Sequence, residues 1–167
     1  SCLDPPLIGS FARPRHMSFV ARMGLFTFKP FAWFIGALNA TPIKEDGGDT
    51  AAIKEVIRRL AAGHAVVIFP EGSRTPDGRQ HEFKRGVAVL MKRAKCPVVP
   101  AAVVGCFEAW PIHRKLPSLL GHRLLVAYGQ PISHEDLMRD GADAALARIE
   151  SEVSRLRAEL EAERDRD

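Results

Sequence analysis

The sequence has 167 residues, a formal net charge of +4 at pH 7 and 46% hydrophobic residues, which suits one folded domain with a real core and argues against a disordered chain. Its three cysteines form no CxxC pair and have no metal-ligand spacing with histidine, so neither a disulfide framework nor a zinc site is expected. No stretch is long and apolar enough to span a bilayer, and no signal peptide is visible.

The first part of the chain predicts short extended pieces around one clear helix. In chain order these are a β-like run at 16–22, an aromatic-rich and mostly helical segment at 24–38, and an extended piece at 40–44. Residues 49–62 predict an amphipathic helix, because four apolar side chains share one stripe and Gly63 follows as a C-terminal stop. The continuous β-branched run at 65–69 is typical of a buried strand.

The second part predicts a helix at 84–94, strands at 98–105 and 123–129, and helix from Ser133 to the end. One narrow apolar seam follows the last helix, at Leu146, Ile149, Val153, Leu156 and Leu160. Strands that alternate with helices predict an α/β fold, with a mainly parallel central sheet flanked by helices and a long C-terminal helix. We expect a main domain at 1–132 and a helical extension at 133–167.

The segment "FPEGSRT" at 69–75 is the densest chemical feature of the sequence. It follows a predicted strand, and ligands of open α/β sheets bind outside the carboxyl ends of strands. Arg74 offers a planar fork of donors that suits phosphate, and Gly72 lets the backbone approach a ligand closely. The alternative is a polar turn in which Glu71 and Arg74 pair with each other or with solvent.

"FPEGSRT" resembles the FPEG(T/S)R signature of the 1-acylglycerol-3-phosphate acyltransferase family of glycerolipid acyltransferases. Other family blocks are matched in the right order by "FVARMGLF" (19–26), "GALNATPIK" (36–44) and "CPVVPAAVVG" (96–105). The resemblance covers roughly residues 1–132, which it identifies as an acyltransferase domain with the glycerolipid acyltransferase-like fold.

The family's catalytic motif is a histidine followed, after four residues, by an aspartate. "SCLDP" (1–5) resembles the end of this motif and places Asp4 on the motif aspartate. None of the six histidines in the sequence has an aspartate five residues later. We therefore expect an N-terminally truncated chain, inactive alone, whose catalytic histidine lies two residues before Ser1.

The resemblance implies transfer of a fatty acyl group from acyl-CoA or acyl carrier protein to the free hydroxyl of lysophosphatidate, which gives phosphatidate. The histidine would act as general base, and Asp4 would orient and stabilise the imidazole. No metal and no cofactor beyond the acyl donor substrate is expected.

The remaining site residues are also implied by the resemblance. Glu71 joins Asp4 as a catalytic residue and helps to position the glycerol part of the acceptor. Gly72 and Ser73 shape the turn around it. The expected phosphate-binding cations are Arg22, Lys44 and Arg74, of which Arg22 and Lys44 exchange the family's usual cation type and keep the charge.

Aromatic side chains alternate with cations in the first 34 residues, which suits peripheral attachment to an anionic membrane surface on its cytoplasmic face. Two alternatives remain open: an acyltransferase for another lysophospholipid or lyso-lipid, and a non-catalytic lipid-binding module if the histidine is truly absent. A nucleic-acid partner is not expected, because it would rest only on the pI of about 9.2.

Overall fold

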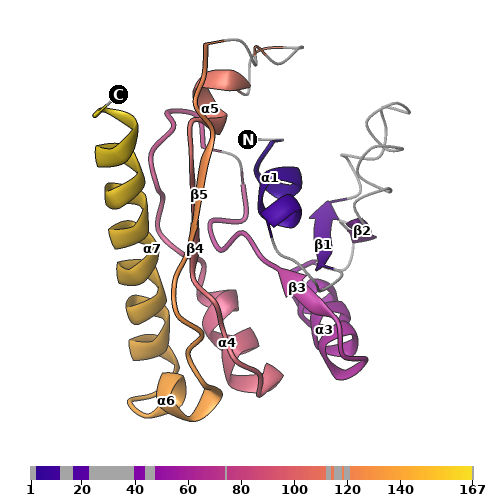
Figure 1. The fold of residues 1–167 in the computed structure, drawn as a ribbon. Coiled ribbons are helices and arrows are strands. Elements are labelled where there is room, and N and C mark those ends of the chain that lie inside the picture. Colours follow the sequence, from indigo (N-terminus) through magenta and orange to yellow (C-terminus); the bar gives the residue numbers. More distant parts are fainter. Residues whose placement is uncertain are drawn as a thin grey trace. The chain divides into compact units, whose positions relative to one another are not determined.

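The structure is a computed structural model, shown in Figure 1. It describes residues 3–11, 17–22, 40–43, 48–73, 75–111, 114, 118 and 121–166. The predicted helix at 24–38 lies outside the described residues. The chain divides into two compact units, one formed by 1–8 with 70–167 and the other by 9–69, and each is described by itself.

The helices and strands follow in chain order. The helices are α1 (Asp4–Phe11), α3 (Gly48–Ala61), α4 (Arg85–Ala94), α5 (Cys106–Ala109), α6 (His134–Met138) and α7 (Ala142–Arg164). The strands are β1 (Met17–Arg22), β2 (Ala40–Ile43), β3 (Ala65–Val67), β4 (Ala101–Val104) and β5 (Leu125–Tyr128).

The unit at 9–69 holds a parallel sheet with the strand order β2-β1-β3. Helix α3 packs against β3 and β1 and buries Val56, a member of the predicted apolar stripe. Gly63 ends the helix as the sequence predicts. Its φ is +83°, and the amide of His64 donates to the Arg59 carbonyl at 3.1 Å, which is the helix-ending pattern that glycine favours.

The other unit is built on β4 and β5, which pair antiparallel from Ala101 opposite Tyr128 to Val104 opposite Leu125. Figure 1 shows the long helix α7 running beside this pair, and its contacts are with both strands. One core cluster therefore joins strand and helix side chains, namely Ala102, Val104, Leu156 and Leu160. A second cluster lies between α4, α6 and α7 and contains Phe83, Met91, Leu137, Ala145 and Ile149.

The α/β class and the long C-terminal helix are confirmed. The apolar seam of α7 faces the core, since Ile149, Leu156 and Leu160 are buried. Two details differ from the sequence-based expectation: the described strands form two sheets, and β5 is antiparallel to β4. The residues between β4 and β5 contain only the four-residue helix α5 among those described, and a parallel return needs a longer crossover. The predicted boundary at 132 stays a prediction.

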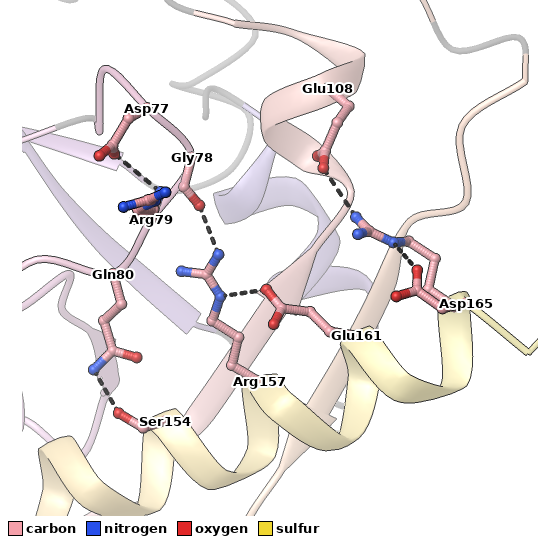
Figure 2. Close-up of polar contacts among 10 residues, drawn as sticks. Asp77, Gly78, Arg79, Gln80, Glu108, Ser154, Arg157, Glu161 and Asp165 are labelled. Atoms are coloured by element: carbon pink, nitrogen blue, oxygen red, sulfur yellow. Dashed lines mark hydrogen bonds and ion pairs between the residues drawn. The ribbon is translucent and has the colours of Figure 1, made fainter.

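Helix α7 also holds the loop that follows the "FPEGSRT" segment (Figure 2). Arg157 donates from Nη2 to the Gly78 carbonyl at 2.7 Å and pairs through Nε with Glu161 at 2.8 Å. Gln80 donates from Nε2 to the Ser154 hydroxyl at 3.0 Å. The loop is thus tied to the helix at two neighbouring points by groups far apart in sequence.

A substitution at Gly105 would test whether the turn between β4 and α5 requires a glycine. Its φ is +89°, and a Cβ at this position would lie 1.9 Å from the Arg123 carbonyl oxygen. We expect Gly105→Ala to lower the free energy of unfolding by about 3 kcal/mol or more in urea titrations. The matched control is Gly86→Ala in α4, where a Cβ would meet no atom within 4 Å beyond its chain neighbours and the nearby backbone of its own helix, and the change should stabilise by about 0.5 kcal/mol. Equal effects of the two changes would contradict this account.

A substitution at Arg157 would test whether α7 stabilises the loop at 71–83. Arg157→Met should lower the free energy of unfolding by about 1–3 kcal/mol, because the Gly78 carbonyl loses a charged donor. It should also speed amide hydrogen exchange at residues 78–81. Arg155→Met is the control, since Arg155 pairs only with carboxylates of its own helix among the described residues, and it should change stability far less than Arg157→Met. Unchanged exchange in Arg157→Met would contradict the tethering.

Candidate active site

A closed loop carries the "FPEGSRT" segment into helix α4. The amide of Lys84 donates to the Pro70 carbonyl at 2.9 Å, so the two ends of the loop at 71–83 meet. Phe83, next to this junction, is buried in the core beside α7. The loop is therefore fixed at its base by a backbone hydrogen bond and by one buried aromatic side chain.

Glu71 is held in place from inside this loop. Its Oε2 accepts a hydrogen bond at 3.0 Å from the backbone amide of His81. The partner is a backbone group, so a carboxylate here keeps its position whatever the tautomer of the His81 ring. One of the two carboxylate oxygens has this partner, and Glu71 is only half-buried.

The far part of the loop has its own polar network. The Thr75 hydroxyl donates to Asp77 Oδ1 at 2.6 Å, the amide of Arg79 donates to the same oxygen at 3.0 Å, and His81 Nε2 lies 3.1 Å from it. The hydrogen bond from the Thr75 hydroxyl contributes most to holding the pKa of Asp77 below its usual value, and the bonds from the Arg79 amide and His81 add to it. Such a turn, in which an Asp side chain accepts from a backbone amide two residues on, gives the loop a fixed shape.

Gly72 brings a second element to the turn. Its φ is +71°, a conformation that other residues adopt at a cost of roughly 1–2 kcal/mol. A Cβ on Gly72 would lie 2.7 Å from Lys84 Cε and 2.8 Å from Lys84 Nζ. The Lys84 side chain therefore lies directly against the glycine. Ser73 is exposed at the edge of the turn.

Asp4 opens helix α1, in the same compact unit as the loop. Tyr128 of β5 donates its hydroxyl to the Ile8 carbonyl, which attaches α1 to the antiparallel sheet. Asp4 is within hydrogen-bonding reach of the buried Cys106 thiol at the start of α5. Burial raises the pKa of Cys106 well above its usual value, and the Asp4 carboxylate raises it further. The thiol thus stays protonated and is a neutral donor beside Asp4.

The structure covers the predicted site residues unevenly. Asp4, Glu71, Gly72 and Ser73 are described and belong to one compact unit, the unit of 1–8 and 70–167. Arg22 belongs to the other unit and ends β1 opposite Ile43, so the carboxyl ends of two parallel strands meet there. The Arg22 side chain, Lys44 and Arg74 lie outside the described residues, and their roles stay predictions. Within the described part of the chain no group of acidic, histidine or cysteine side chains could hold a metal ion.

Three residues of this region were not assigned from the sequence. Cys106 is about a hundred positions from Asp4 along the chain, and no local pattern could have paired them. His81 and Lys84 follow the signature by several residues, and only the closure of the loop brings them back to Glu71 and Gly72. One local signal was present for Lys84: a cation at the start of a predicted helix is unfavourable at that end of the helix dipole.

Comparison with known proteins agrees with the resemblance. Over 158 residues the chain is 29% identical to the 1-acyl-sn-glycerol-3-phosphate acyltransferase of Streptococcus pneumoniae, which covers 92% of this chain and 56% of that protein. The Bacillus subtilis protein of the same name is 26% identical over 159 residues, covering 95% of this chain and 76% of the relative. The chain thus spans only about half the length of some of these curated relatives.

A solved structure shares the fold. The crystal structure of the 1-acyl-sn-glycerophosphate acyltransferase PlsC from Thermotoga maritima matches with a TM-score of 0.76 and 25% identity, covering 97% of this chain and 63% of that one. The model of the family named Acyltransferase matches residues 1–104, which is more than half of the chain. This chain therefore belongs to the Acyltransferase family.

Proposed function

We propose that this chain is part of a 1-acylglycerol-3-phosphate acyltransferase, which moves a fatty acyl group from acyl-CoA or acyl carrier protein to the free hydroxyl of lysophosphatidate. The observation that carries the proposal is the signature turn itself. Glu71 is fixed by a backbone amide, and the turn lies in the same unit as Asp4, the motif aspartate. The names of the relatives support the same reaction class.

In this proposal the reaction is a direct transfer. The histidine that the family resemblance implies would take the proton of the acceptor hydroxyl while the oxygen attacks the thioester carbon. The tetrahedral intermediate collapses, the carbon–sulfur bond breaks, and the leaving thiolate takes the proton from the imidazolium, which regenerates the base. Asp4 stabilises the imidazolium that forms, and the protonated Cys106 thiol beside it adds no competing charge.

Glu71 and the predicted cations act on the acceptor in this proposal. Glu71 keeps one carboxylate oxygen for the glycerol part of the substrate, because the other accepts from the His81 amide. Arg22, Lys44 and Arg74 supply the charge for the phosphate. We further propose peripheral attachment to an anionic membrane surface, on its cytoplasmic face. None of the described helices is long and apolar enough to cross a bilayer.

The test is the release of free CoA by the full-length gene product. Thiol release from acyl-CoA should require lysophosphatidate, and Asp4→Asn should lower kcat by roughly 10²–10⁴-fold, since the imidazole loses its charged partner. Arg74→Ala should raise KM for lysophosphatidate. The control, Asp143→Asn, changes an exposed aspartate in the first turn of α7 and should leave both constants unchanged.

Two results would count against the proposal. Faster release with another lysophospholipid than with lysophosphatidate would move the acceptor to the alternative class. Release that no lysophospholipid stimulates, together with binding of lipid vesicles, would favour a non-catalytic lipid-binding module.

A further inference from the structure

Lys84 lies against the signature turn although it is the residue that precedes helix α4. The two ends of the loop meet through the bond from the Lys84 amide to Pro70, so the side chain of Lys84 starts beside the turn. It then lies over Gly72, where a Cβ would come within 2.7–2.9 Å of its Cδ, Cε and Nζ. The ammonium group therefore lies beside the glycine of the turn.

The charge of Lys84 has no partner in the part of the chain that the structure describes. No ion pair or side-chain hydrogen bond of Lys84 is present there, and the nearby Glu71 carboxylate accepts instead from the His81 amide. The residue is exposed, so a ligand can reach it. An exposed ammonium group that lies at the turn, with no counter-ion among the described residues, suits an anion from solution.

Lys84 does not stabilise the start of helix α4. Lys84 is the N-cap of α4, makes no side-chain capping bond, and precedes Arg85 at the first helical position, and the first turn holds no acidic residue. Two cations at this end oppose the helix dipole, and lysine is a poor N-cap. Local choices that work against the fold are expected mainly at functional sites.

We propose that Lys84 binds a phosphate group of a substrate at the signature turn, as a cation in addition to the three predicted ones. This inference rests on the proposed function, because it assigns Lys84 to the same site. Two substrates carry such a group: the acceptor, as a phosphate monoester, and the acyl-CoA donor, as nucleotide phosphates. A free ammonium group recognises either one as a point charge.

The first experiment is steady-state kinetics of the full-length gene product, with acceptor and donor varied separately. Lys84→Met should raise KM for one of the two substrates roughly tenfold to a hundredfold, with kcat within about threefold, because a charged hydrogen bond made in both ground and transition state is lost. Lys84→Arg should restore most of the loss, since it keeps the charge. The matched control is Lys92→Met, at an exposed lysine in the last turn of the same helix.

The kinetic outcomes show which substrate Lys84 binds, and they test this inference separately from the proposed function. A raised KM for lysophosphatidate assigns Lys84 to the acceptor, and a raised KM for acyl-CoA assigns it to the donor. Unchanged KM values for both in Lys84→Met, with normal wild-type activity, would overturn the inference and leave the proposed function intact. An equal loss in Lys84→Arg, with a lowered Tm, would show a structural role and also overturn it.

The second experiment measures binding and needs no turnover. It therefore tests the role of Lys84 even if the wild type proves inactive and the proposed function fails. Titration calorimetry would measure binding of glycerol 3-phosphate, which stands for the acceptor headgroup, and of adenosine 3′,5′-bisphosphate, which stands for the nucleotide of the donor. Lys84→Met should weaken binding of one probe at least tenfold, and Lys84→Arg and Lys92→Met should not. If Lys84→Met binds both probes like the wild type, or the wild type binds neither, the inference is wrong.

Discussion

The hydrogen bond from the Lys84 amide to the Pro70 carbonyl is the constraint on which the candidate site depends. A loop of this length loses much conformational freedom when its ends are joined, and the buried Phe83 next to the junction supplies part of the compensating energy. Once the ends meet, the carboxylate of Glu71 and the ammonium of Lys84 both lie at the same turn, although thirteen positions separate them in the sequence.

The family model ends at residue 104, yet helix α7, at Ala142–Arg164, supports the loop that carries the signature. Its apolar seam fills both core clusters, and its polar side holds the loop through Arg157 and Ser154. The loop backbone at Gly78 also lies close to the Phe107 ring of α5, where a Cβ would come within 2.8 Å. The outer part of the loop therefore contacts both α7 and α5. The C-terminal helix belongs structurally to the unit that carries the signature turn.

The features predicted correctly are those set by neighbours in the sequence. The stripe of α3, the stop at Gly63 and the seam of α7 follow from helical spacing and glycine conformation, and the positions of the strands follow from β-branched runs. The buried strand predicted at 65–69 is wrong in part, because β3 ends at Val67 and is half-buried, and Ile68 and Phe69 are exposed. The antiparallel return of β5 was missed because strand direction depends on how the connection crosses the sheet. The contact of Asp4 with Cys106 was missed for a similar reason: it exists only once α1 is attached to β5 through Tyr128. The signature turn was found, because its residues are contiguous, whereas Lys84 comes to it only through loop closure.

Glycine at position 72 meets two separate demands. The first is conformational, because a φ of +71° is strained for any residue with a Cβ, whatever surrounds it. The second is steric and concerns charge: a Cβ would occupy the space of the Lys84 side chain, whose flexible end would have to move away. The first demand sets the direction of the backbone beside Glu71, and the second leaves room for the Lys84 side chain, whose charge has no partner among the described residues. The glycine of the signature therefore allows a positive charge to lie close to the turn as well as shaping the backbone, which a motif read only as a flexible turn does not reveal.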